Sequence, residues 1–217
     1  MTLSTPPAVP DHKSSFKIFF QGTLVLLLVS GVLAVPILLA WVRLQKPQAG
    51  HGPLQLPAYG SAPSFTLNSQ NGTVTDSKSL LGKVWIADFI FSRCGTMCPL
   101  MTQTMKQLQK DLPGISFVSF TVDPEFDTPE VLKNYIKRFD LPLEGWSFLT
   151  GDHAHMKETV NGFKVSGANE PMFHSLSFVL VDPQGILRGY YPSNDTQAME
   201  KLRKEASALR QAQNSQM

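Results

Sequence analysis

The longest run of hydrophobic positions extends from Ile18 to Val42 and contains no charged residue. As a helix it would be roughly 37 Å long, which exceeds the ~30 Å hydrocarbon core of a bilayer. Lys17 precedes the run, and Trp41 lies where interfacial aromatic residues are common. The apolar region of a cleaved signal peptide is shorter, about 7–15 residues. We therefore predict an uncleaved transmembrane helix over residues 18–42.

Polar segments without a helical or strand period flank the rest of the chain. Residues 1–17 form a short N-terminal tail that contains Asp11 and is not rich in Arg, which is unlike a mitochondrial transit peptide and favours a bacterial envelope protein. Residues 43–62 are rich in Pro, Gly, Ala and Gln, as linkers are. Residues 211–217 are polar and are predicted to be a disordered tail. One domain, residues 63–210, is expected between linker and tail.

Within this domain, apolar β-rich runs alternate with amphipathic helical patterns. The predicted strands cover residues 84–91, 115–122, 146–149, 175–181 and 186–191, and the predicted helices cover residues 99–110, 129–139, 152–161 and 195–209. Thr128 and Asp152 are expected N-caps, and the strand at 146–149 is expected at a sheet edge. The turn Asp182-Pro183-Gln184-Gly185 predicts a closing hairpin. The pattern predicts an α/β, thioredoxin-like fold, a central mixed sheet flanked by helices, behind a single N-terminal transmembrane helix.

Composition narrows the chemistry of this domain. The chain has 217 residues, 42% of them hydrophobic, and a formal net charge of +2. This hydrophobic content is enough to build a core. No long basic run or basic-aromatic patch is present, so no nucleic-acid partner is expected.

The only two cysteines are Cys94 and Cys98, separated by Gly-Thr-Met. Two cysteines cannot form a disulfide framework, and the sequence shows no pattern of further ligands for a structural zinc site. The pair follows a predicted strand and precedes a helix with Pro99 in its first turn, where the helix dipole favours thiolate. Converging thiolates select Cu(I), and the same pair permits thiol–disulfide exchange. His174, at the start of a buried strand, is the best candidate for a third ligand because imidazole also suits copper, although a histidine there is more often structural.

Three segments resemble the Sco/SenC copper proteins of cytochrome c oxidase assembly. They are FIFSRCGTMCPLMT (Phe89–Thr102), TVDPEFDTPEVLKNYIKRF (Thr121–Phe139) and HSLSFVLVDPQGILRGYY (His174–Tyr191). The resemblance implies a thioredoxin fold whose Cys94, Cys98 and His174 bind a copper ion, and whose two cysteines form a disulfide when oxidised. The sequence departs from the frequent C-P-[DE]-x-C form, because Gly95-Thr96 stand where Pro and an acid are common.

The resemblance also implies partners and a location. The expected partners are the copper-binding subunit of a cytochrome c oxidase and a copper donor protein. The expected location is the bacterial inner (cytoplasmic) membrane, crossed once, with the domain in the periplasm. The expected function is that of a metallochaperone rather than an enzyme. The alternative is a thiol–disulfide oxidoreductase that reduces the oxidase copper-site cysteines or other envelope disulfides.

Two acids that are not themselves ligands are candidates for influencing the protonation of the two thiols. Asp88 lies within an apolar strand, where a carboxyl group must be paired or protonated, and it precedes Cys94 at the offset of the buried acid in thioredoxins. Asp123 follows the second strand, whose carboxyl end faces the same crevice. For both residues a purely structural role is an open alternative. Asp88 would then be a hydrogen-bonded acid of the core, and Asp123 would serve the Asp-Pro turn.

Soft or basic side chains near the motif have simpler explanations. Met97, Met101 and Met105 recur every fourth position, which favours core packing, with Met97 a partial exception because it lies between the cysteines. His153 and His155, with Met156, are expected at the surface rather than in a second metal site. Arg93 either favours the Cys94 thiolate or is simply solvated. The chemistry is therefore expected at Cys94, Cys98 and His174.

Overall fold

The computed structural model describes residues 56–165 and 176–215. Its strands are β1 (Thr66–Ser69), β2 (Val74–Asp76), β3 (Trp85–Ile90), β4 (Ser116–Thr121), β5 (Trp146–Thr150), β6 (Ser177–Val181) and β7 (Leu187–Pro192). Its helices are the 3-10 turn η1 (Ser77–Leu80) and the α-helices α2 (Met97–Asp111), α3 (Pro129–Phe139), α4 (His153–Gly162) and α5 (Thr196–Asn214). The strands form one mixed sheet in the order β2-β1-β5-β4-β3-β6-β7. Strands β3, β4 and β5 pair in parallel, and β6 joins β3 antiparallel and continues through a hairpin to β7.

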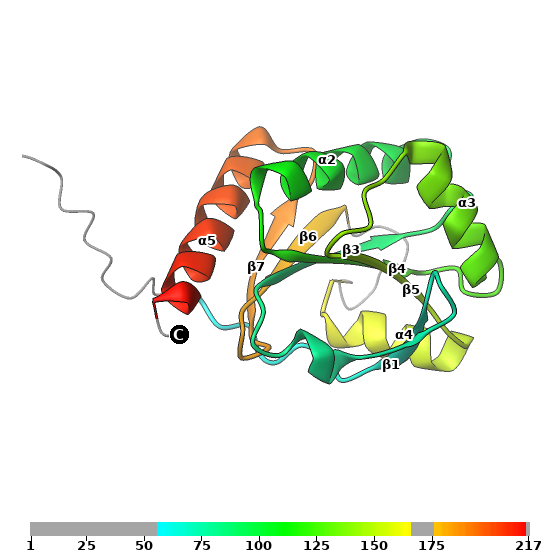
Figure 1. Ribbon diagram of the computed structural model, residues 1–217, viewed down its shortest axis with the longest axis horizontal. Helices are drawn as coiled ribbons and strands as arrows, with labels where there is room; N and C mark the ends of the chain where they lie inside the picture. Colours follow the sequence, from blue (N-terminus) through cyan, green and yellow to red (C-terminus); the bar gives the residue numbers. More distant parts are fainter. Residues whose placement is uncertain (1–55, 166–175, 216–217) are drawn as a thin grey trace, which may run out of the picture. The chain divides into compact units, whose positions relative to one another are not determined.

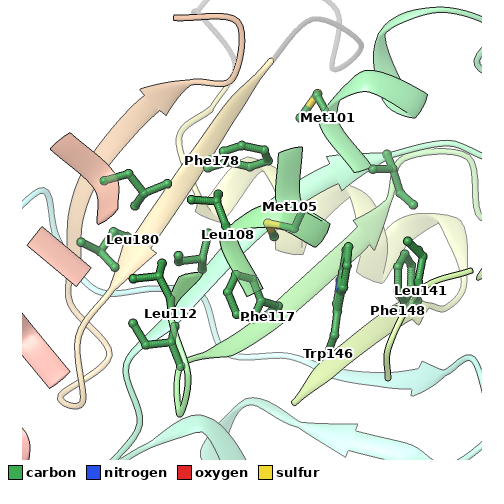
Figure 2. Packing of buried hydrophobic residues seen from close by; sticks show 14 of the residues in the cluster. Met101, Met105, Leu108, Leu112, Phe117, Leu141, Trp146, Phe148, Phe178 and Leu180 are labelled. Carbon is green, nitrogen blue, oxygen red and sulfur yellow. The ribbon is translucent and has the colours of Figure 1, made fainter. Parts of the chain in front are cut away.

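Helices cover both faces of this sheet (Figure 1). On one face, α2, α3 and α5 bury apolar side chains with the strands around Phe117, Trp146 and Phe178. Figure 2 shows the labelled side chains of α2 packed over those of the central strands. On the other face, α4 packs on a second apolar cluster around Phe120 and Phe163. The central strands carry apolar residues on both faces because both are covered, as parallel sheets require.

The predicted α/β, thioredoxin-like arrangement is confirmed, and several boundaries agree closely. Helix α3 begins at Pro129 behind its N-cap Thr128, whose side chain accepts a hydrogen bond from the Val131 N–H. Asp152 caps α4 in the same way through the His155 N–H. Gly185, in the predicted hairpin turn, has φ of 77°, a conformation that glycine adopts without steric cost. Local capping and turn chemistry therefore set these element ends.

Other predictions were wrong in detail. Strand β5 is not an edge strand, because β1 pairs with it antiparallel and β2 extends the sheet further. Helix α2 begins at Met97, two residues before the predicted start, so Cys98 lies inside the helix. Helix α5 continues to Asn214, so residues 211–214 are helical rather than part of a disordered tail. Residues 59 and 62 of the predicted linker donate backbone hydrogen bonds to the β6–β7 hairpin.

The predicted transmembrane helix over residues 18–42 falls outside the described residues. Within the two described ranges, no helix is both long and apolar enough to cross a membrane.

Candidate functional site

The two cysteines lie where the central strand β3 leads into α2. Cys94 occupies the connecting loop, and Cys98 is the second residue of α2. Both are free thiols. The Cys98 backbone N–H donates a hydrogen bond to the Cys94 Sγ at 3.4 Å, which ties the loop cysteine to the helix start. The start of a helix offers unpaired N–H groups and the positive end of its dipole, and both stabilise a thiolate. The loop and the helix therefore bring both sulfurs together at one end of α2.

The two thiols differ in environment. Cys94 is half-buried, whereas Cys98 is 5% exposed and belongs to the apolar cluster under α2. Partial burial raises the pKa of the Cys94 thiol, but hydrogen bonds from the N–H groups of Cys98, Thr96 and Met97 outweigh it and lower the pKa below its ordinary value. Burial raises the pKa of the Cys98 thiol to about 12, with nearby Cys94 and Asp88 contributing, against the opposing effect of the Phe91 backbone. Cys94 is thus the reactive thiol and Cys98 the protected one.

A buried carboxylate, Asp127, holds the loop that carries Cys94. Asp127 is fully buried and accepts hydrogen bonds from the Ser92 N–H at 3.0 Å, from the Ser92 hydroxyl, and from the Thr121 hydroxyl at 2.5 Å. Thr121 ends β4, and Ser92 lies two residues before Cys94. This carboxylate therefore fixes the cysteine loop to the neighbouring strand. The role of Asp127 was not predicted from the sequence, although its position shortly after the Asp123-Pro124 turn, within the TVDPEFDTP segment, points to a structured loop.

Asp123 lies beside the cysteine loop, as predicted, but its partner is Arg93. The Arg93 Nε donates to the Asp123 carboxylate at 2.9 Å, and its guanidinium lies 4.5 Å from the centre of the Phe126 ring. The Asp123 backbone carbonyl also accepts hydrogen bonds from two later N–H groups of its turn. Arg93 is exposed, but it is paired rather than free to balance the Cys94 thiolate. The pair links the cysteine loop to the β4–α3 loop.

Asp88 is buried behind the cysteines, and it is 0% exposed. Every second residue of a strand points to the same face, so Asp88 shares a face with Ile86 and Ile90. Both isoleucines belong to the apolar cluster that includes Cys98 and the buried side of α2. Burial raises the pKa of Asp88 to about 7, and the Ser119 hydroxyl on the paired strand reduces this increase only in part. Within the described residues, neither carboxylate oxygen makes a hydrogen bond of ordinary geometry. Beyond the Ser119 hydroxyl, a partner for a charged Asp88 is lacking there, and the acid gains or loses its proton close to neutral pH.

A second buried polar contact lies on this face. The Thr102 and Tyr135 hydroxyls share a 2.6 Å hydrogen bond between α2 and α3. Both residues are buried, and the Tyr135 pKa is raised by burial together with the charges of Asp88 and Cys98. This pair was not predicted from the sequence, because nothing in the spacing of two residues on different helices shows that they meet.

The remaining predicted residues separate into core and surface. Met101 and Met105 are fully buried in the apolar cluster under α2, as predicted, whereas Met97 is half-buried. Met156 was predicted at the surface, and this was wrong: it is 1% exposed and belongs to the apolar cluster that α4 packs on. His153 and His155 are exposed and bind different carboxylates, Glu125 and Asp152 respectively, which confirms their predicted surface position.

His174 falls outside the described residues, so its predicted position beside the cysteines is not described. Within residues 56–165 and 176–215, no three His, Cys, Asp or Glu side chains are arranged to hold a metal ion. The described part of the site offers two sulfur atoms, one half-buried and one buried, at the positive end of a helix. Such a donor pair fits a soft, thiophilic ion, and it fits dithiol–disulfide chemistry equally well.

Comparison with known proteins adds independent evidence. A family model described as SCO1/SenC matches residues 55–208. The SCO1 protein homolog of Bacillus subtilis is 39% identical over 137 residues, which cover 58% of this chain and 71% of that protein.

Solved structures agree with this match. BsSco is a member of the Sco family of cytochrome c oxidase assembly proteins in which a disulfide switch was identified. Its structure superimposes with a TM-score of 0.61 at 33% identity, and the match covers 71% of this chain and 95% of BsSco. Yeast Sco1 with copper bound superimposes with a TM-score of 0.57 at 26% identity, covering 69% and 92%. The chain therefore belongs to the SCO1/SenC family.

Proposed function

We propose that this protein is a copper metallochaperone that holds copper through Cys94, Cys98 and His174 and delivers it to the copper centre of a cytochrome c oxidase during assembly. The observation that carries the proposal is the pair of free thiols joined at the start of α2 by the 3.4 Å hydrogen bond. Family membership supports it, as do two solved relatives: BsSco, which belongs to a family of oxidase assembly proteins, and yeast Sco1, whose structure holds copper.

The local structure suits reversible holding of a soft ion. Thiolates are the ligands that select Cu(I), and each thiol loses its proton when it binds metal. The N–H groups at the start of α2 stabilise negative charge on Cys94, and Asp127 keeps the loop in place before the ion arrives. Because Cys94 is half-buried, the ion has access from the surface. Burial of Cys98 shields the other side of the site from solvent.

The proposal includes a membrane anchor. The uncharged run Ile18–Val42 supports a single-pass helix in the bacterial inner membrane, with the domain in the periplasm. Such an anchor would confine the domain to the membrane that contains the oxidase. Protease accessibility of the domain in spheroplasts, compared with inverted vesicles, tests this topology.

Delivery is tested by transfer between purified proteins. The reduced full chain is loaded with one equivalent of Cu(I) and mixed anaerobically with a copper-free copper-binding domain of a cytochrome c oxidase. We expect copper to move to the acceptor from the wild type, whereas Cys98→Ser carries none. If wild-type protein retains its copper beside an empty acceptor, and deletion of the gene leaves the copper content of the oxidase unchanged, delivery is wrong.

The unequal thiols favour a second candidate function, reduction of disulfides. The Cys94 thiolate attacks one sulfur of a substrate disulfide, and the other sulfur leaves as a thiolate that takes up a proton. Cys98 then loses its proton and attacks the Cys94 sulfur, which releases the second substrate thiolate. The substrate gains two electrons, and the chain ends as a Cys94–Cys98 disulfide. A half-buried attacking thiol of lowered pKa beside a buried resolving thiol is the arrangement that this reaction needs.

The two functions share one pair of sulfurs, so the redox state selects between them. Forming the disulfide removes both thiolate ligands at once. His174→Ala separates the functions, because reduction requires only the cysteines, whereas copper holding is proposed to require the imidazole as well. A variant that keeps disulfide reductase activity and loses copper affinity would support two separable roles. Loss of both activities in a folded His174→Ala protein would contradict this division.

A further inference from the structure

Met97 differs from the two methionines that follow it on α2. Met101 and Met105 are 1% and 0% exposed, and both belong to the buried apolar cluster drawn in Figure 2. Met97 is half-buried, and neither apolar cluster of the described residues includes it. Core packing therefore accounts for Met101 and Met105 and leaves Met97 without that explanation.

The position of Met97 places it against the Cys94 loop. Met97 is the first residue of α2, and its backbone N–H is one of the donors directed at the Cys94 sulfur. Long side chains on a helix lean toward its N-terminus and cover the turn that precedes their own Cα. For the first residue of α2, that preceding segment is the loop that carries Cys94. The general lean of helix side chains therefore directs the Met97 thioether toward the Cys94 loop.

The chemistry of the thioether matches the ion proposed for this site. Methionine sulfur is a soft ligand that favours Cu(I), as thiolate does. It is neutral and carries no proton, so it can bind and release an ion without proton transfer. Cys94 and Met97 are both half-buried while Cys98 is enclosed, so an ion that approaches from solvent meets the loop thiol and the thioether first.

We infer that Met97 is a further sulfur ligand, which holds Cu(I) together with Cys94 and Cys98 while the ion enters and leaves the site. This inference rests on the proposed copper-binding function and deepens it. It assigns a role to the one residue between the cysteines that has a metal-binding side chain. It also makes the entrance of the site selective for Cu(I) over Cu(II), for which a neutral thioether is a weaker partner than imidazole.

The test compares Met97→Leu with Met101→Leu in the reduced full chain. Leucine conserves the volume of methionine and removes the sulfur. Cu(I) affinity, measured by competition with a chromogenic chelator, should weaken roughly tenfold in Met97→Leu, at the lower end of the range for residues around metal sites. Cu(II) affinity should not change, and Met101→Leu should match the wild type for both ions.

X-ray absorption of the Cu(I)-loaded His174→Ala protein gives an independent readout. We expect three sulfur neighbours in that variant and two when Met97→Leu is added. If Met97→Leu binds Cu(I) like the wild type and the sulfur count does not fall, the inference is overturned while the proposed function stands. An equal loss in Met101→Leu would also overturn it, because helix packing would then be the cause. If the wild type binds no Cu(I), both the inference and the proposed function fail.

Discussion

Replacing Asp88 by asparagine tests how the buried acid behind the cysteines affects stability. Burial raises its pKa from 3.8 to about 7, so the folded state holds this proton more tightly than the unfolded state does. At low pH the group is protonated in both states and has no effect. As pH rises from about 4 to above 7, ionisation favours the unfolded state, and stability falls. The full effect of a shift of this size is about 4 kcal/mol at 1.36 kcal/mol per unit.

The amide side chain of the Asp88→Asn variant cannot ionise, so the variant escapes this pH-dependent loss. A buried amide without partners has its own penalty of about 1–3 kcal/mol, so the net gain at pH 8 should be about 1–3 kcal/mol. At about pH 5, ionisation of Asp88 has already lowered the free energy of unfolding of the wild type by about 1.5 kcal/mol. Between pH 5 and pH 8 the difference in this free energy between Asp88→Asn and the wild type should therefore widen by ~2–3 kcal/mol.

The assay is urea unfolding of a reduced fragment, residues 53–217, which form one compact unit. The fluorescence of the buried Trp85 and Trp146 reports unfolding. Asp140→Asn is the matched control. The Asp140 side chain is fully exposed, its 3.6 Å ion pair with Lys106 lies in solvent, and asparagine tolerates its left-handed backbone. The control thus removes a carboxylate without removing a buried one. A stability difference between Asp88→Asn and wild type that does not change with pH would refute the reasoning.

Three further predictions concern the loop, the thiols and a helix cap. Asp127→Ala should lower the free energy of unfolding by about 3 kcal/mol, because it removes a buried carboxylate that accepts several hydrogen bonds. It should also weaken Cu(I) binding, because the Cys94 loop is no longer held to β4. Urea unfolding measures the first effect, and Cu(I) titration measures the second. Iodoacetamide near neutral pH should modify Cys94 well before Cys98, as peptide mass spectrometry would detect, and equal rates would contradict the contrast in burial and pKa. Thr128→Ala should destabilise the domain by about 1 kcal/mol through loss of the α3 cap without changing copper affinity, and an altered affinity would contradict the separation of cap and site.

The fold was predictable where local chemistry decides it. The cap at Thr128 and the turn ending at Gly185 depend on neighbouring residues, so the sequence locates them correctly. The neighbours of β5 depend on β1 and β2, which have only four and three residues. Their sequences, TLNS and VTD, show no clear alternation of apolar and polar residues, although the side chains of β1 alternate between exposed and buried in the fold. Pairing between strands far apart in sequence is a tertiary property. For that reason β5 was wrongly placed at the edge.

The site divides in the same way. The spacing of Cys94 and Cys98 and the following proline predicted two thiols near a helix start. The earlier start of α2, which takes in Cys98, was missed because Pro99 suggested the first turn without fixing its first residue. The role of Asp127 was missed because a carboxylate in a polar loop is usually solvated, and only the folded chain brings it under Ser92. The contribution of His174 stays a prediction from the sequence and the family.

The central claim, that Cys94, Cys98 and His174 hold copper, is tested most directly by anaerobic Cu(I) titration of the reduced full chain. Wild type is titrated beside Cys98→Ser and His174→Ala in competition with a chromogenic chelator. We expect one Cu(I) per wild-type chain, weaker binding in His174→Ala, and loss of tight binding in Cys98→Ser. Wild-type protein that binds Cu(I) no more tightly than Cys98→Ser would contradict it.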